Sequence, residues 1–323
     1  MLIGLSAVIV AVEQNEPKVF IVRGAEHALS AGVKPTNEEG DALPFGPFDP
    51  DSHATLEMGL RAWVENQTPM TPGYVEQLYT FGNRGRYAGQ AAEDSRVVSI
   101  GYLALTYQDK TQTGENVFWG DWYSYFPWED WRAGKPKVIN DVIELGLKRW
   151  VNAAETKDEK THRRTRANIC FGLDDSPWDE EKVLERYELL YEARLVYESI
   201  RDKGLKVDYV LVPGRSMLYD HRRILATAMG RLRGKLKYRP VVFELVPPEF
   251  TLLHLQKTVE AIVGHSLHKQ NFRRLVEGSG MVEEVPGKKS AEAGGRPAAL
   301  FRFRKGVVFE RPAPGVKLSP AVS

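Results

Sequence analysis

The sequence predicts an α+β fold, in which a mixed α/β sandwich domain with a helical insertion precedes a small domain of helices and a hairpin. Near the N-terminus, β-branched runs surround one amphipathic helix, which is typical of mixed α/β layers. Helical patterns dominate residues 133–214, and near the C-terminus two short helical patterns precede two strand patterns. The order of the elements therefore indicates at least two folded units.

The composition is that of an ordinary globular protein. The chain has 323 residues, of which 42% are apolar and 27% charged, so it can bury a sizeable core. The longest apolar run, Leu5 to Val12, is too short to cross a bilayer, and no basic segment precedes it. We therefore expect a cytoplasmic protein without a membrane partner. The single cysteine, Cys170, excludes an internal disulfide and a zinc cluster built from cysteines.

The net charge of +1 hides an uneven distribution. Residues 213–323 contain 20 Lys and Arg against 9 Asp and Glu, whereas residues 1–212 contain 24 against 34. A nucleic-acid-binding module joined to an acidic sensor would show this imbalance, although segregated charge can also hold domains together.

The N-terminal part contains four strand patterns and one helix. The runs "LIGLSAVIVAVE" and "VFIVRG" are joined by a polar turn with proline, which predicts a hairpin. "ATLEMGLRAWVENQT" places Leu56, Leu60 and Val64 on one helical stripe. "YVEQLYTFG" and "RVVSIGYLALTY" follow as predicted strands.

The middle of the chain predicts helices. Two long patterns cover residues 136–155 and 178–203, and a polar stretch separates them. A third helix, "LYDHRRILATAMGRLRGKL", has a basic face, and residues 238–246 are expected to form a strand.

The C-terminal region predicts two short helices joined by a tight turn. The first begins after Thr251, an N-cap residue, and stops at Gly264. The second, "SLHKQNFRRLVEGSG", can turn Leu267, Phe272, Leu275 and Val276 inward and is expected to end at Gly278. Its outer face is basic and amide-bearing, which is typical of a helix-turn-helix. A merely solvated polar face is the alternative.

A predicted hairpin follows these helices. "GMVEEV" and "AALFRFR" alternate as strands around "PGKKSAEAGGRP", whose cations are Lys288, Lys289 and Arg296. Two helices followed by a hairpin have the order of a winged helix. The second helix would enter the major groove, where Arg reads guanine and Asn or Gln reads adenine, while the wing contacts phosphate.

These residues carry a family resemblance. The run "LRGKLKYRPVVFELVPPEFTLLHLQKTVEAIVGHSLHKQNFRRLVEGSGMVEE", followed by "GGRPAALFRFR", resembles the C-terminal half of the Nudix-related transcriptional regulators of NAD metabolism, the NrtR type. The resemblance implies an N-terminal Nudix-like domain that senses ADP-ribose, NAD or a related nucleotide, and a homodimer that represses transcription by binding double-stranded operator DNA. By resemblance, the DNA-contacting positions are Lys269, Gln270, Asn271, Arg273, Arg274 and Arg296.

The Nudix box is the test of whether such a front domain is an enzyme. A hydrolytic box needs several glutamates on adjacent helical turns, so that they hold magnesium against a diphosphate. Here Arg61 and Glu65 match the pattern, while Ala62, Asn66 and Thr68 replace two glutamates and a glycine. We therefore predict no catalytic residue, no metal site and no cofactor.

The residues that remain suit a sensor, which binds a nucleotide without hydrolysing it. Arg84 and Arg86 are candidates for gripping its phosphates, and Phe45, Tyr79 and Phe81 for stacking its base. Arg61 and Glu65 would lie in the same pocket. The alternatives are a solvated loop for the arginines, core packing for the aromatic residues, and a helical ion-pair ladder of Glu57 with the two box residues.

The sequence thus predicts a ligand-responsive repressor. Its expected units are a Nudix-like core, a helical insertion, a closing helix of the core, a winged helix and a tail, at residues 1–132, 133–214, 215–239, 240–305 and 306–323. The rival hypothesis is an active Nudix pyrophosphatase acting on ADP-ribose or a related nucleoside diphosphate. A third hypothesis keeps DNA binding but makes the sensor vestigial.

Overall fold

The computed structural model describes residues 2–23, 40–67, 73–83, 97–107, 116–290 and 297–306. Strands β1 (Leu2–Glu13) and β2 (Glu16–Arg23) form the predicted antiparallel hairpin. Its turn residues Gln14 and Asn15 have φ of 51° and 65°, in the left-handed region that tight hairpin turns require.

The central sheet is mixed. Its order is β3-β2-β1-β6-β5, and β4 and β7 also pair with β1 and β2, respectively. The additional strands are β3 (Asp41–Ala42), β4 (Phe45–Pro47), β5 (Tyr74–Phe81), β6 (Val97–Leu105) and β7 (Val117–Asp121). β1 and β6 are parallel, so the chain must cross over between them, and α2 (Leu56–Gln67) lies within that connection.

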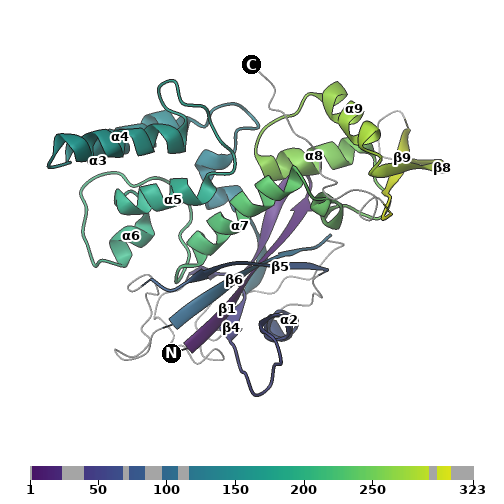
Figure 1. Ribbon diagram of the computed structural model, residues 1–323, viewed down its shortest axis with the longest axis horizontal. Helices are drawn as coiled ribbons and strands as arrows, with labels where there is room; N and C mark the ends of the chain where they lie inside the picture. The colour runs from purple at the N-terminus through teal and green to yellow at the C-terminus, as the bar shows by residue number, and fades with distance from the viewer. Residues whose placement is uncertain are drawn as a thin grey trace.

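Two helices cover opposite faces of this sheet (Figure 1). Alternate β1 side chains point to opposite faces, and Leu5 and Ile9 join the cluster that contains Leu60 and Val64 of α2. Val8, Val10 and Val12 of β1 point the other way and join the cluster that includes α7 (His221–Leu236). This alternation produces the predicted mixed α/β sandwich.

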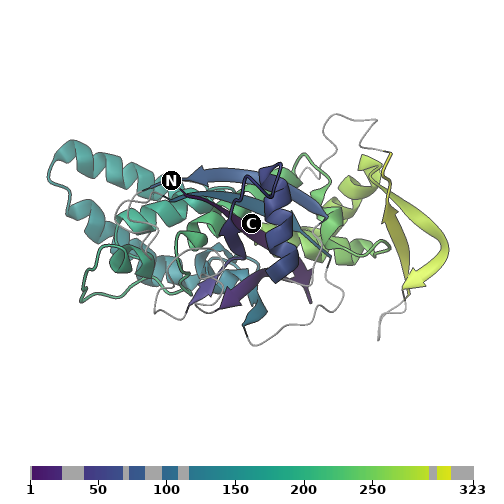
Figure 2. The same ribbon diagram turned by 90° about the horizontal axis from the view of Figure 1, so that it is seen from below.

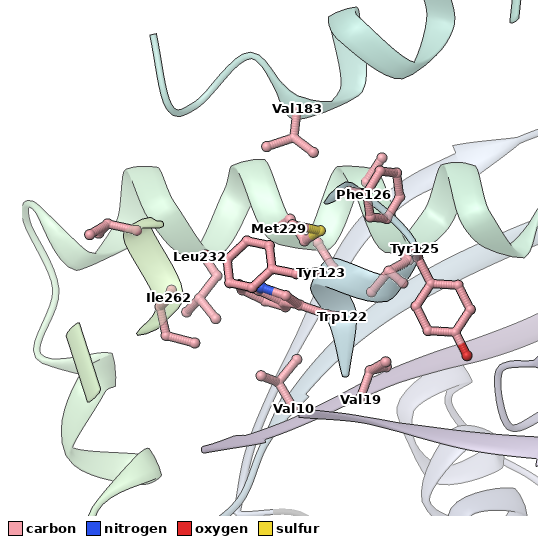
Figure 3. Close-up of a cluster of buried hydrophobic side chains, with 14 of the residues drawn as sticks. Val10, Val19, Trp122, Tyr123, Tyr125, Phe126, Val183, Met229, Leu232 and Ile262 are labelled. Carbon is pink, nitrogen blue, oxygen red and sulfur yellow. The ribbon is translucent and has the colours of Figure 1, made fainter. Parts of the chain in front are cut away.

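The core on the α7 face draws on described residues from both ends and the middle of the chain. Figure 3 shows Trp122 and Tyr123 lying between the β1–β2 hairpin and α7. They belong to the short 3-10 helix η1 (Trp122–Ser124), which precedes η2 (Pro127–Glu129). Val183 and Ile262, from segments much later in the chain, enter the same cluster.

The helical region has more helices than the sequence predicts. A π-helix, η3 (Ile139–Ile143), continues into α3 (Glu144–Asn152), and α4 (Lys157–Phe171), α5 (Val183–Glu192) and α6 (Tyr197–Arg201) follow. We name this region, residues 139–210, the helical segment. The polar stretch expected between the two long helices is largely helical and forms α4. Thr156 caps this helix at its N-terminus, and only Ala167 and Phe171 are buried, which explains why its sequence is so polar. The predicted helix over 178–203 breaks where Arg194 adopts a φ of 60°.

The strand expected at 238–246 is a 3-10 helix, η4 (Val241–Leu245). Val241, Val242 and Leu245 are buried, a spacing of three and four rather than the alternation of a strand. No helix within the described residues is long and apolar enough to span a membrane.

The C-terminal domain has the predicted order. It consists of α8 (Leu252–Val263), α9 (Lys269–Ser279), β8 (Val282–Ser290) and β9 (Ala298–Phe303). Thr251 caps α8 by accepting from the His254 backbone amide, as predicted, and Gly264 ends it. α9 continues past Gly278 and ends at Gly280, which has a φ of 65°. Figure 2 shows this domain at one end of the molecule and the helical segment at the other.

Candidate nucleic-acid interface

Helix α9 presents the predicted contact residues to solvent. Phe272 and Val276 are 2% and 0% exposed and hold one side of the helix against the domain. Gln270 and Arg274, four residues apart, lie on the opposite side and are exposed. The remaining predicted contacts in the described residues are also exposed; they are Lys269, Asn271, Arg273, Lys288 and Lys289. Arg296 lies outside the described residues.

The turn before α9 is held by one buried carboxylate. Glu260 of α8 is 4% exposed and accepts hydrogen bonds from the backbone amide of Leu267 and the side chain of Gln256, both at 2.9 Å. Lys257 donates to its other oxygen at 2.7 Å. Burial by itself would raise the Glu260 pKa, but these donors lower it. An ionised Glu260 therefore fixes how α9 leaves the turn.

Only some of the surface cations have ion-pair partners. Arg273 bonds Glu277 at 3.0 Å, four residues along α9, and Lys288 bonds Glu249 at 2.6 Å. Within the described residues, Lys269, Arg274 and Lys289 have no carboxylate partner. These unpaired cations leave positive charge along α9 and the wing, which is the charge that phosphate attracts.

The C-terminal end of α8 is bonded to the front domain. Its last carbonyls accept hydrogen bonds from the Tyr123 hydroxyl at Ala261 (2.8 Å) and from the Arg233 guanidinium at Ile262 (3.0 Å). A Cβ on Gly264 would lie 2.5 Å from a backbone oxygen, so a glycine is needed for this close approach. The DNA-binding candidate is thereby fixed to the body of the protein.

A buried ion triad lies directly beneath this contact. Glu129 bonds Arg186 of α5 at 2.6 and 2.8 Å and Arg233 of α7 at 2.6 Å, and all three side chains are fully buried. Burial would raise the pKa of Glu129, but the two guanidiniums outweigh it and lower that pKa. The triad joins the helical segment, the core helix and the C-terminal domain at one point.

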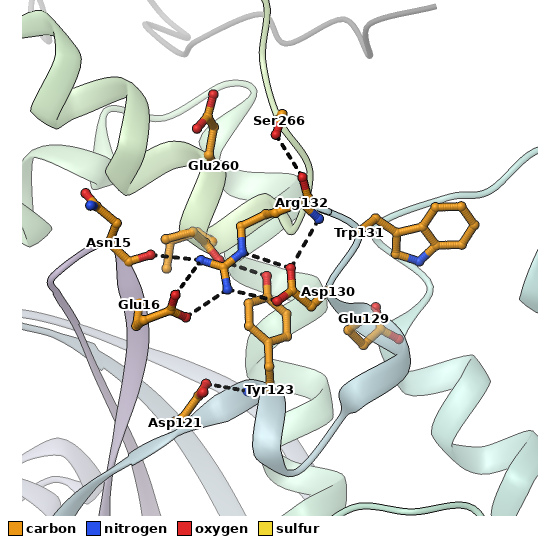
Figure 4. A network of polar contacts seen from close by, with 12 residues as sticks. Asn15, Glu16, Asp121, Tyr123, Glu129, Asp130, Trp131, Arg132, Glu260 and Ser266 are labelled. Carbon is orange, nitrogen blue, oxygen red and sulfur yellow. Dashed lines mark hydrogen bonds and ion pairs between the residues drawn. The ribbon is translucent and has the colours of Figure 1, made fainter. Parts of the chain in front are cut away.

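A second, half-exposed network lies beside the triad (Figure 4). The Arg132 guanidinium bonds Asp130 and, at 2.8 and 3.2 Å, Glu16 of the β1–β2 hairpin. Ser266, in the turn before α9, donates to the Arg132 carbonyl at 3.1 Å. The hairpin and the helix-turn-helix therefore share one polar anchor.

The residues of the degenerate Nudix box lie on α2, as expected. The Arg61 guanidinium bonds Glu57 at 2.9 to 3.0 Å, which is the first rung of the alternative ion-pair ladder, and Glu65 is exposed. Gly46 is required because a Cβ there would lie 2.1 Å from the ring of Trp63. The described residues contain no group of three acids, histidines or cysteines able to hold a metal ion. These residues do not fit a Nudix magnesium site.

The predicted nucleotide-stacking residues are not all available. Phe45 is 4% exposed, packed against Tyr219 and His221 at centroid distances of 5.1 Å. Phe81 is 3% exposed beneath the guanidinium of Arg223. Because both rings are enclosed by the core, we correct their predicted role from stacking to packing. Tyr79 is 60% exposed, whereas Arg84 and Arg86 lie outside the described residues.

Comparisons with known proteins agree with this architecture. Residues 242–303 match the model of the NrtR DNA-binding winged helix domain. The ADPR responsive transcriptional repressor NtrR of Acinetobacter baylyi is 45% identical over 102 residues, which are 32% of this chain and 37% of that relative's length. The C-terminal domain is therefore an NrtR-type winged helix, as the resemblance implied.

Solved structures extend the likeness to the whole fold. Shewanella oneidensis NrtR aligns over 95% of this chain and 96% of its own, with 20% identity and a TM-score of 0.54. Its complex with a 27mer DNA aligns over 95% of each chain, with 19% identity and a TM-score of 0.52. A MutT/nudix family protein from Enterococcus faecalis covers 94% of this chain and 86% of its own, with 14% identity and a TM-score of 0.52. The predicted Nudix-like domain with a C-terminal winged helix is thus confirmed as the fold.

Two residues that hold this candidate interface in place, Glu260 and Glu129, are not among those that the sequence singles out. Glu260 lies among the apolar residues that become α8, and Glu129 lies in the aromatic run "WYSYFPWEDW". The one local sign of such a residue is an acid inside an apolar or aromatic run. An acid is rarely buried unless it is paired, so a buried partner is expected for it. The partners, however, lie far apart in sequence and become visible only in the fold.

Proposed function

We propose that this chain is a ligand-responsive, DNA-binding transcriptional repressor. The observation that carries the proposal is the exposed face of α9 in a winged helix of the NrtR type. Phe272 and Val276 fix the helix, and Gln270 and Arg274 project from its free side, where they can reach base edges in a major groove. The unpaired Lys289 of the wing is suited to a phosphate contact.

The proposal extends to the genes and the effector. The similar Acinetobacter repressor is named as ADPR responsive, so we propose that this chain responds to ADP-ribose or a related nucleotide and acts in NAD-related metabolism. A homodimer in the cytoplasm would place two winged helices on the two halves of a palindromic operator. Ligand binding to the front domain would change the fit of that pair to DNA.

Fluorescence anisotropy with labelled DNA from upstream of the gene tests DNA binding. Arg274→Ala should weaken binding by about 5- to 150-fold, the cost of losing roughly 1–3 kcal/mol of base contact. Lys289→Ala should weaken binding to all sequences similarly. It should also reduce the slope of the logarithm of the binding constant against the logarithm of salt concentration by about one. Lys148→Ala, at an exposed lysine of α3, is the matched control.

Two results would contradict DNA recognition through α9. The first is wild-type affinity in the Arg274 variant, and the second is an equal loss in the Lys148 control. Adding ADP-ribose to the complex tests the effector, because a shift in the binding isotherm is expected if the front domain senses it. Light scattering coupled to size exclusion tests the dimer.

We also propose that the front domain is not a hydrolase. The proposal is supported by Ala62 and Asn66 standing where a Nudix box has glutamates, and by the Glu57 carboxylate being held by Arg61. Incubation with ADP-ribose and Mg²⁺ should release no AMP above the buffer control. Release that disappears in Glu65→Gln would instead establish the pyrophosphatase hypothesis.

A further inference from the structure

The helical segment contains a cavity far from the winged helix. Its volume is about 430 Å³, and its walls come from α3, α4, the end of α5 and the chain that follows α5. A cavity of this size is far larger than a single phosphate and falls in the range of small-molecule sites, about 300–1,000 Å³. No part of the proposed DNA contact or of the Nudix box contributes to it.

Three arginines line this cavity, and two of them lack a counter-ion. Arg149 and Arg194 are exposed and, in the part of the chain that the structure describes, neither contacts a carboxylate. Arg163 is held in place, because it donates to the Trp150 carbonyl at 2.7 Å and to Glu159 at 2.5 Å. Arg149 and Arg194 therefore present positive charge that no carboxylate in the described residues neutralises.

Aromatic rings position these guanidiniums. The Arg149 guanidinium lies 5.0 Å from the ring centre of Tyr209, and that of Arg163 lies 4.8 Å from Trp150. The Tyr209 hydroxyl donates to the Arg194 carbonyl at 3.0 Å, which ties the wall residues together. Arginines stacked on aromatic rings keep their donors free for a bidentate contact, and their flat faces can stack a planar ring.

The single acid in the lining does not cancel this charge. Glu192 is engaged by both terminal nitrogens of Arg166, at 2.9 and 2.5 Å. The rest of the wall is small or apolar, formed by residues such as Gly146 and Leu195. The cavity thus combines phosphate-binding donors with flat and apolar surface.

We propose that this cavity binds a small phosphorylated molecule with a planar ring, of the nucleoside phosphate class. Arg149 and Arg194 bind the phosphate, and the planar ring packs against the apolar wall beside Tyr209 and Leu195. This site is separate from the nucleotide site expected in the Nudix-like domain, and it does not depend on DNA binding.

Isothermal titration of the full chain with AMP, without DNA, tests the proposal. The variant Arg149→Gln/Arg194→Asn should bind AMP at least tenfold more weakly than the wild type. Asn is chosen because Arg194 has a φ of 60°, a conformation that Asn tolerates. The control is Arg164→Gln, an exposed arginine of α4 outside the lining, which should bind as the wild type does.

Two further titrations separate the parts of the ligand. Adenosine and inorganic phosphate should each bind at least tenfold more weakly than AMP, because each lacks half of the contacts. Inorganic phosphate that binds as tightly as AMP would reduce the cavity to a simple anion site and overturn the proposal.

Other outcomes are equally decisive. If AMP gives no heat with the wild type, or binds the double variant unchanged, the cavity is not a nucleotide site. Arg149→Lys, which keeps the charge but loses the planar fork, should give an intermediate affinity. Thermal unfolding of the double variant and of Arg149→Lys, each compared with the wild type, tests whether lost binding arises from lost folding.

Discussion

Helices α7 and α9 both carry several arginines, but they place them in opposite environments. In α7, Arg222 and Arg233 are 1% and 0% exposed, whereas Arg273 and Arg274 of α9 face solvent. α7 lies between the sheet and the helical segment, which contributes Glu198 to Arg222 at 3.0 Å. α9 has only a narrow apolar stripe and is otherwise open to solvent. The same residue type is therefore buried and paired with acids in one helix and exposed to solvent in the other.

This difference changes what the charge asymmetry means. The positive surplus of residues 213–323 is partly internal, because the arginines of α7 neutralise acids from the rest of the chain. Arg223 contacts Glu188, and Lys235 contacts Glu76 at 2.5 Å. The basic face predicted for this helix is thus wrong for its two buried arginines. The case for DNA binding rests on α9 and the wing alone.

Removing the acid under α7 should have the largest effect on stability. Glu129→Gln leaves Arg186 and Arg233 buried without their counter-charge, and the expected cost is about 3–5 kcal/mol of unfolding free energy. Urea denaturation followed by circular dichroism measures it. A loss under about 1 kcal/mol would mean that water reaches the triad and that the contrast with α9 is overstated.

The same carboxylate predicts acid sensitivity. The two arginines lower the pKa of Glu129 below its ordinary 4.5 despite its burial, so the unfolded chain takes up this proton first as pH falls. Its contribution to stability is complete above pH 4.5 and is lost as pH falls through the folded pKa. The Gln variant should lack this part of the acid response.

A smaller effect is expected from His221, at the start of α7. The ring is fully buried and accepts a hydrogen bond from the Leu43 amide at 3.0 Å, and burial lowers its pKa from 6.5 to about 3. The unfolded chain therefore binds the proton more tightly, so stability is highest above pH 6.5 and falls below it. The loss from pH 7 to pH 5 should be about 2 kcal/mol.

Urea midpoints at the two pH values, in the wild type and in His221→Asn, isolate this contribution. The variant should be less stable at pH 7 but should lose less on acidification. An identical pH response in both proteins would show that His221 is not the group responsible.

Local signals in the sequence were enough to predict most elements of the fold. The hairpin turn, the Thr251 cap and the Gly264 stop depend on neighbouring residues, and all are present in the structure. The predicted elements are wrong where contacts between residues far apart in the sequence determine the local structure. The apolar residues of 238–246 predict a strand, but prolines flank them and residues Val241–Leu245 form a short 3-10 helix.

The candidate site divides in the same way. The exposed face of α9 was predictable because the buried positions, Phe272 and Val276, recur at helical spacing. The burial of Phe45 was not, since it depends on Tyr219 and His221, more than a hundred residues away. The arginine-lined cavity was also missed, because Arg149 and Arg194 meet only when three helices pack together.

The smallest expected effect comes from the surface pair of α9. Glu277→Gln breaks an exposed ion pair with Arg273, so stability should change by only about 0–1 kcal/mol. The same change frees a guanidinium and removes a negative charge that would repel phosphate, so DNA should bind a few-fold more tightly at low salt. Glu144→Gln, which breaks the equivalent Lys148 pair on α3, should leave DNA binding unchanged. Anisotropy titrations with DNA compare the two variants directly. Weaker DNA binding by Glu277→Gln would mean that Glu277 orients Arg273 toward DNA and does not hold it away.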